Sequence, residues 1–323
     1  MDQPGGAPTG ESVRYPLNLE RVLGLTFSLL RFRWRGFVAV SLAVGLPVFV
    51  LVALLQVAIG DDLARFQQAQ LDIAEGRPIS LGELVPLSAL AVTFLAITVA
   101  GVGGYLTQAA VIALAAGTYA AKPATIRYAF AATARHWLAL IAAAAVMFVV
   151  LFATLFVGGF AGVGLFLTTL GGGPGAFGGL LAIVTAGALV IFLTVRWSLV
   201  AQVVMLEDLP AVAALRRSWR LVAGSSWRML GYTILFAIMV GGIGLLVDTF
   251  SAAFLGTGLR LVSGQLIFEP VPYLVGTLIS AVVSLALAPI SIIGLTLLYF
   301  DLRHRRGEPP LPSLPKEQLQ PDL

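Results

Sequence analysis

The sequence predicts an all-α, polytopic membrane protein with six transmembrane helices. Two observations carry this prediction. Of the 323 residues, 59% are hydrophobic and only 11% are charged, whereas soluble domains carry about a quarter charged residues. Uncharged runs also reach the roughly 20 residues that a helix needs to cross a bilayer. The composition therefore excludes an ordinary soluble globular protein and an intrinsically disordered one.

The apolar runs follow one another in a regular order. No charged residue lies between Trp137 and Val195, which is too long a stretch for one helix, so we expect the glycine-rich segment 171–179 to break it. Segment 249–268 is amphipathic and is expected to form an external loop or a helix lying on the outer surface. The six expected spans are 37–59, 86–119, 137–159, 179–206, 229–247 and 272–300.

Basic residues orient these spans. Segments 1–36, 120–137, 207–228 and 301–323 hold 16 of the 20 Lys and Arg residues, and Arg196 makes 17. Cytoplasmic loops carry such an excess of Lys and Arg, so both termini are expected in the cytoplasm and the loops 60–85, 160–178 and 248–271 on the external side. The expected organisation is a disordered cytoplasmic segment 1–18, a single membrane domain 19–302 and a disordered cytoplasmic tail 303–323.

Three segments on the basic side repeat one pattern, a short amphipathic helix that leads into a span. Apolar residues recur at helical spacing on one face, and arginines occupy other faces. Three cytoplasmic amphipathic helices are therefore expected, and each is followed by two spans. This order predicts three tandem repeats of one orientation, although any short cytoplasmic connection also tends to be basic and amphipathic. The apolar faces contain Leu23, Phe27, Leu30 and Trp34; Ile126, Phe130, Thr133 and Trp137; and Leu215, Trp219 and Val222.

The residues that usually carry chemistry are scarce. Cysteine is absent, and the two histidines, His136 and His304, lie far apart beside arginines. This excludes thiol chemistry and gives no ligand set for zinc. The net charge of +4 is concentrated at the ends of apolar segments, which favours a membrane surface over nucleic acid. No cofactor and no catalytic residue are expected.

Polar residues inside or beside the spans are the candidate functional residues. Arg196 either faces a cavity and binds an anion or a lipid phosphate, or extends its guanidinium to the inner headgroups from the end of a long helix. Gln108 and Gln202 either line a site or form hydrogen bonds between helices. The arginines of the third amphipathic helix are candidate contacts for anionic lipid headgroups: Arg216, Arg217 and Arg220.

Three stretches resemble one known family. They are 206-LEDLPAVAALRRSWRLVAGSSWRMLG-231, the opening 15-YPLNLERVLGLTFSLLRFRWRGF-37 and the ending 289-PISIIGLTLLYFDLRHRRGE-308. They resemble the membrane domain associated with bacterial glycerophosphodiester phosphodiesterases, which has six-span members without a catalytic domain. The resemblance implies architecture and no activity. The phosphodiesterase reaction of that family belongs to a separate soluble barrel, for which the residues after the last span leave no room.

Two functions remain open at the level of sequence. The first is a non-catalytic membrane protein of the bacterial plasma membrane that acts as a lipid-associated scaffold or accessory protein. Its expected partners are membrane lipids, including anionic ones, and a protein of unknown identity. The alternative is a transporter or channel for a lipid-like or amphipathic solute, which would require a cavity lined by Gln108, Arg196 and Gln202.

Overall fold

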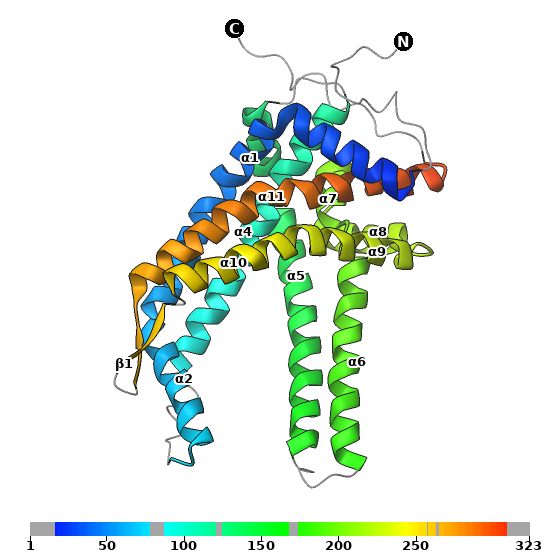
Figure 1. Cartoon of the computed structure of the whole chain (residues 1–323). Coiled ribbons are helices and arrows are strands. Elements are labelled where there is room, and N and C mark those ends of the chain that lie inside the picture. Colours follow the sequence, from blue (N-terminus) through cyan, green and yellow to red (C-terminus); the bar gives the residue numbers. More distant parts are fainter. Residues whose placement is uncertain are drawn as a thin grey trace. The chain divides into compact units, whose positions relative to one another are not determined.

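The computed structural model describes residues 17–77, 87–120, 125–167, 174–256, 258–262 and 265–308. Within these residues the chain is almost entirely helical (Figure 1). Six helical segments are long and apolar enough to cross a membrane, which confirms the predicted all-α, six-span fold class. Their bounds are Leu19–Ala58, Leu87–Tyr119, Ile126–Phe166, Gly175–Glu207, Ser226–Leu255 and Pro270–Arg305.

Contacts between residues divide the chain into two compact units. The first unit comprises residues up to 26, residues 112–234 and residues from 294 onward; the second comprises residues 27–111 and 235–293. The helices α1 (Leu19–Ala58), α4 (Leu87–Tyr119) and α11 (Pro270–Arg305) contribute residues to both. Each unit is described below by itself. The predicted segments 1–18 and 303–323 lie outside the described residues, except for their inner ends.

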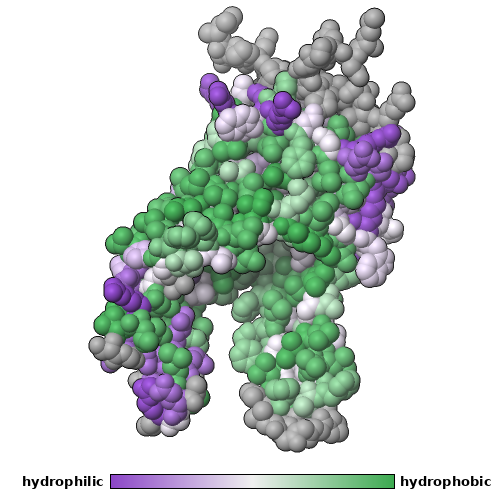
Figure 2. All heavy atoms as spheres, viewed as in Figure 1, coloured by the Kyte–Doolittle hydropathy of each residue, from purple (hydrophilic) through white to green (hydrophobic). Residues whose placement is uncertain are grey.

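The first unit contains a long helical hairpin formed by α5 (Ile126–Leu167) and α6 (Pro174–Arg196). The two helices run side by side and antiparallel (Figure 1). A break between these helices was predicted at 171–179, but α6 already begins at Pro174. Proline is well suited to the first turn of a helix. Hydrophobic side chains cover the outer surface of this hairpin (Figure 2), as expected for helices that contact lipid tails.

Three short helices complete the first unit. They are α7 (Val200–Glu207), α8 (Ala211–Val222) and α9 (Ser226–Phe236). The expected continuous span 179–206 is thus divided by a turn after Arg196. The core of the unit lies where these helices meet the end of α11, and its fully buried side chains include Leu199, Leu221, Met229, Leu297 and Tyr299.

The second unit contains two elements that differ from the sequence-based expectation. Residues 60–85 were expected as a loop, yet Gly60–Ala74 form helix α2, which has Asp61 and Asp62 in its first turn, where acidic side chains favour a helix start. Segment 249–268 is neither one helix nor a plain loop. It contains the end of α10 (Gly242–Leu255) and an antiparallel hairpin of β1 (Leu259–Val262) and β2 (Gln265–Phe268).

Packing of the hairpin against α2 explains this difference. The backbone N–H of Leu266 donates a hydrogen bond to the side-chain oxygen of Gln68 on α2, at 3.1 Å. The Phe268 ring lies against Gly60, so closely that a Cβ at position 60 would stand 2.0 Å from it. The two segments are far apart in sequence, and neither carries a local pattern that announces this contact.

The predicted amphipathic segments adopt three different forms. The first forms the beginning of α1, the same long helix that contains the first span. Non-helical backbone at Arg33 (φ −134°, ψ 33°) makes a kink in this helix. The second continues into α5 without a break. The third is the separate helix α8. The predicted three-fold repeat and the location of these helices at a membrane surface stay predictions.

Candidate functional site

The buried residues of α8 show which face of this helix packs against the protein. These residues follow helical spacing and include Ala211, Ala214, Leu215, Ser218, Leu221 and Val222. Arg216 and Arg220 therefore lie on the exposed side, whereas Arg217 is half-buried. The three arginines that the sequence grouped as lipid contacts thus occupy two different environments.

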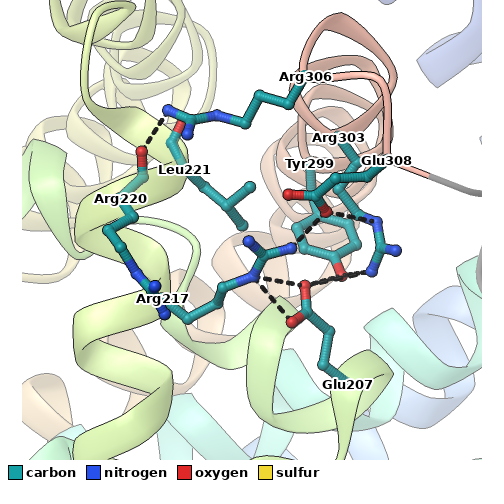
Figure 3. Close-up of polar contacts among 8 residues, drawn as sticks. All are labelled: Glu207, Arg217, Arg220, Leu221, Tyr299, Arg303, Arg306 and Glu308. Carbon is teal, nitrogen blue, oxygen red and sulfur yellow. Dashed lines mark hydrogen bonds and ion pairs between the residues drawn. The ribbon is translucent and has the colours of Figure 1, made fainter.

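Arg217 belongs to a polar network formed with α7 and the end of α11 (Figure 3). Its Nε donates to Glu207 Oε2 at 2.9 Å, and its Nη2 donates to Glu308. Tyr299 donates its hydroxyl to Glu207 Oε1 at 2.7 Å, and Arg303 Nη1 lies 3.2 Å from the same oxygen. The side chains of Arg217 and Glu207 are only 18% and 13% exposed. Two carboxylates and two guanidinium groups thus neutralise one another in a largely dry environment.

This pairing shifts the pKa values of Glu308 and Arg217. The hydrogen bond from Arg217 lowers the pKa of the Glu308 carboxyl, since the ionised form accepts that bond best. In return, the hydrogen bond to Glu308 raises the pKa of the Arg217 guanidinium. Both groups therefore stay charged at neutral pH, and neither is poised to transfer a proton.

Arg306 fastens the C-terminal end of α8. Its Nη2 donates to the carbonyl oxygens of Ala223, at 2.9 Å, and Leu221, at 3.3 Å, and also to that of Arg220 (Figure 3). The last carbonyls of a helix have no partner within the helix, and a cation there also meets the negative end of the helix dipole. Arg217 and Arg306 therefore hold α8 at its middle and at its end.

A second junction forms around Asp301, whose side chain is fully buried. Its Oδ1 accepts the backbone N–H of Leu17 at 2.7 Å, and its Oδ2 accepts Arg228 Nη1 at 2.7 Å and Arg305 Nε at 2.8 Å. Arg228 and Arg305 also donate to the carbonyl oxygen of Leu17. The entry to α1, the start of α9 and the end of α11 are thus joined at one carboxylate.

These contacts shift one predicted boundary. The disordered tail was expected from residue 303, but α11 extends to Arg305, and ion pairs include residues as far as Glu308. The carboxylates Glu207 and Asp301 supply partners for the basic residues of this segment. The remaining residues of the predicted tail lie outside the part of the chain that the structure describes.

Arg196 lies at the C-terminal end of α6. Its guanidinium carbon stands 5.1 Å from the ring centre of Phe192 and 5.0 Å from that of Trp219, distances typical of cation–π contacts. The carbonyl of Arg196 accepts the Ser218 hydroxyl at 2.9 Å. Its Nε is buried and has no hydrogen-bond partner among the described residues. Arg196 therefore joins α6 to α8 through aromatic stacking.

The two glutamines have different surroundings. Gln202 on α7 is fully buried, and neither atom of its amide has a hydrogen-bond partner among the described residues. Gln108 is half-buried on α4, in the second unit. The inter-helix hydrogen bond expected for Gln202 is therefore not formed within the described part of the chain.

Comparison with known families agrees with the resemblance noted in the sequence. Residues 177–321 match the family model described as the membrane domain of glycerophosphoryl diester phosphodiesterase. The matched range is consistent with that resemblance; it runs from α6 through α11 and contains Glu207, Arg217 and Asp301. No curated protein and no solved structure matches the chain.

Sequence reasoning missed the acidic partners in the two junctions. Glu207 and Asp301 each lie at the end of an apolar span, and Glu207 binds Arg217, one of the arginines that were assigned to lipid. A carboxylate in that position is costly near hydrocarbon unless it is paired. That cost was the available signal, but it does not show which of the many nearby arginines supplies the partner. Among the described residues, no three His, Asp or Glu side chains gather to hold a metal ion.

Proposed function

We propose that this protein is a non-catalytic, lipid-associated scaffold or accessory protein of the bacterial plasma membrane. The observation that carries the proposal is that the three arginines of α8 have different environments. Arg217 is bound by Glu207 and Glu308 and fixes the helix, which leaves Arg216 and Arg220 on its exposed side. A helix fixed in this way presents a preformed basic surface, and the basic side of a membrane protein faces the anionic inner leaflet.

Two exposed tryptophans that lie close to these arginines in the sequence also support the proposal. Trp219 on α8 is partly exposed, and Trp227 at the start of α9 is 85% exposed. Tryptophan is favoured at the level of the lipid headgroups, where the ring is buried and the N–H group remains hydrated. Arginines and tryptophans together are typical of a helix that lies at a membrane surface.

The test separates the exposed arginines from the paired one. The Arg216→Gln/Arg220→Gln variant should fold normally, because Arg217 keeps its carboxylate partners. In nanodiscs of mixed phosphatidylethanolamine and phosphatidylglycerol, it should retain less phosphatidylglycerol than the unchanged protein. The preference for phosphatidylglycerol should weaken by at most about 2 kcal/mol, which is roughly thirtyfold in relative affinity. The difference between the variant and the unchanged protein should become smaller as salt is added.

Two controls make this test specific. The Arg65→Gln/Arg77→Gln variant removes two arginines from the predicted external side and should leave phosphatidylglycerol retention unchanged. Arg217→Gln should lower the melting temperature, because it leaves Glu207 and Glu308 without a major partner. If the Arg216/Arg220 variant retains phosphatidylglycerol like the unchanged protein, the proposed lipid surface is wrong.

A further inference from the structure

Two adjoining cavities lie within the second unit. The first measures about 310 Å³ and is formed by α10, α11 and Phe49 of α1. The second measures about 220 Å³ and is formed by α1, α4 and α11. Phe49 and Ser284 line both, so the cavities meet at these two residues. Ligand pockets in proteins begin at about 300 Å³, and the pair therefore offers enough space for part of a lipid molecule.

The first cavity is polar although transmembrane helices form it. Tyr273, Thr277, Ser280 and Ser284 line it from α11, and their spacing of four, three and four residues puts them on one helix face. Polar side chains within a transmembrane helix are costly unless they face protein or a hydrated cavity. This stripe of hydroxyl groups therefore marks the face of α11 that is turned away from lipid tails.

One carboxylate sets the charge of this cavity. Asp248 on α10 lines it together with Ser251, and no arginine, lysine or histidine is among its described lining residues. A carboxylate that shares a cavity with hydroxyl groups can accept hydrogen bonds from an ammonium group, and it repels a net negative headgroup. The hydroxyl groups can donate as well as accept, so they can also bind the oxygens of a phosphate or an ester.

The second cavity has the opposite character. Its described lining is almost wholly apolar and includes Val48, Val52, Leu285 and Ile292. Two glycines of α4 line it: Gly103 packs closely against Val48, whereas a Cβ at Gly104 would meet nothing within 4 Å. An apolar cavity of this kind suits the methylene groups of an acyl chain.

We propose that the two cavities together bind one zwitterionic, amine-bearing phospholipid. Asp248 and the hydroxyl stripe hold its headgroup, and the apolar cavity holds part of an acyl chain. The pairing of a polar, anionic compartment with an apolar one matches an amphipathic molecule that ends in an ammonium group. This site prefers phosphatidylethanolamine over phosphatidylglycerol, which is the reverse of the preference proposed for the arginines of α8.

Two variants test the two compartments separately. Asp248→Asn removes the charge and keeps the shape, and since Asp248 is exposed the variant should fold. Gly104→Leu fills the apolar cavity, which Gly104 lines, without a backbone clash, because a Cβ there meets nothing within 4 Å. The matched controls are Asp61→Asn on α2 and Gly101→Leu on α4, since Gly101 also has free space at its Cβ and does not line either cavity.

The measurement is native mass spectrometry of lipids retained after extraction from vesicles of equal phosphatidylethanolamine and phosphatidylglycerol. All proteins carry Arg216→Gln and Arg220→Gln, so that the anionic surface of α8 does not contribute. The parent should retain phosphatidylethanolamine in roughly threefold to tenfold excess, the range expected for the net contribution of one hydrogen bond. Asp248→Asn should abolish the excess, and Gly104→Leu should lower the amount retained, while both controls behave as the parent. Equal retention of the two lipids by the parent, or an excess that survives Asp248→Asn, would overturn the proposal.

Discussion

Asp208 holds the turn between α7 and α8 in an unusual backbone conformation. Among the described residues it is the one non-glycine residue with φ in the left-handed region, at 54°. This conformation ends α7 directly after Glu207 and allows α8 to begin three residues later. The side chain of Asp208 also contacts His136 and Arg135 of α5, with Oδ1 2.9 Å from His136 Nε2.

A matched pair of substitutions separates the backbone conformation of Asp208 from its side-chain contacts. Asp208→Gly and Asp208→Ala both remove the carboxylate, but only glycine adopts the left-handed conformation without cost. The glycine variant should therefore be more stable than the alanine variant by about 1 kcal/mol. Thermal denaturation in detergent measures the difference. An alanine variant that melts at or above the glycine variant would contradict this view of the turn.

The pairing of Glu308 with Arg217 predicts a dependence of stability on acid. Because the folded-state pKa of Glu308 lies below its ordinary value of 4.5, its contribution is complete above pH 4.5 and is lost as pH falls through the folded pKa. The melting temperature should therefore fall on acidification. The free energy of unfolding of Glu308→Gln should be about 1 kcal/mol lower at pH 7 than that of the unchanged protein. Its melting temperature should also fall less between pH 5 and pH 3. An identical fall in the variant would assign the acid sensitivity to other groups.

Side-chain contacts could be predicted from the sequence less well than the fold. It identified Arg216, Arg217 and Arg220 as one basic group, and helical periodicity correctly put them off the apolar face. It did not separate Arg217 from its neighbours, because the partners Glu207 and Glu308 lie 10 and 91 residues away in sequence. Only the packing of α8 against α7 and α11 distinguishes these arginines.

Close contact between α5 and α6 rests on glycines. A Cβ at Gly162 would lie 2.9 Å from the carbonyl oxygen of Gly179, and one at Gly158 would lie 2.3 Å from the Cβ of Ala186. Gly158 and Gly162 are four residues apart on one face of α5, the spacing by which small residues let membrane helices approach. The two backbones can therefore approach each other only while these positions lack side chains.

Gly162→Ala tests this contact. It should destabilise the hairpin by about 1–3 kcal/mol, because the Cβ would meet the backbone oxygen of Gly179 as well as the Ile183 side chain, and the backbone cannot turn aside. The control is Gly159→Ala on the same helix, where a Cβ meets nothing within 4 Å and alanine should be neutral or slightly stabilising. The measurement is the melting temperature of each variant. Equal melting temperatures for Gly162→Ala and Gly159→Ala would show that the two helices can move apart without loss of stability.

Two groups of glycines, within residues 101–104 and 241–244, have different roles in the structure. Gly103 packs closely against Val48, whereas Gly101 and Gly104 meet nothing nearby. Gly241 ends the π-helical turn η1 (Ala237–Gly241), and Gly242 begins α10, a local irregularity of the helix rather than a packing contact. One group thus includes a close packing contact and the other lies at a helix irregularity, and the composition of such a group does not decide between the two roles.

At the scale of the whole molecule, the orientation of the spans is the main prediction that follows from charge. Because the chain lacks cysteine, single cysteines report sidedness without background. Gln70→Cys on α2 should react with a membrane-impermeant maleimide in intact cells, and Ala223→Cys after α8 should react only after permeabilisation. Labelling of Ala223→Cys in intact cells would reverse the orientation and place the arginines of α8 outside.

The number and order of the spans could be predicted because each span needs a long apolar run, which is a local property of the sequence. Their ends could not, because contacts set them. Helix α6 stops at Arg196, where the guanidinium stacks on Trp219, and α11 extends to Arg305, where Asp301 binds two arginines. Helix α2 and the β1–β2 hairpin likewise form against each other.

The junction at Asp301 has a consequence for biosynthesis. Leu17 and Asp301 are 284 residues apart, so the start of the chain leaves the ribosome long before its partner has been made. Loop closure over such a distance is not the obstacle, since each doubling of loop length costs only about 0.6 kcal/mol. Timing is the obstacle, because the backbone groups of Leu17 and the guanidinium of Arg228 must stay hydrated until the last span has been inserted. Closure of this junction must therefore await the synthesis of α11, and chains that stop before residue 301 leave Arg228 without its carboxylate.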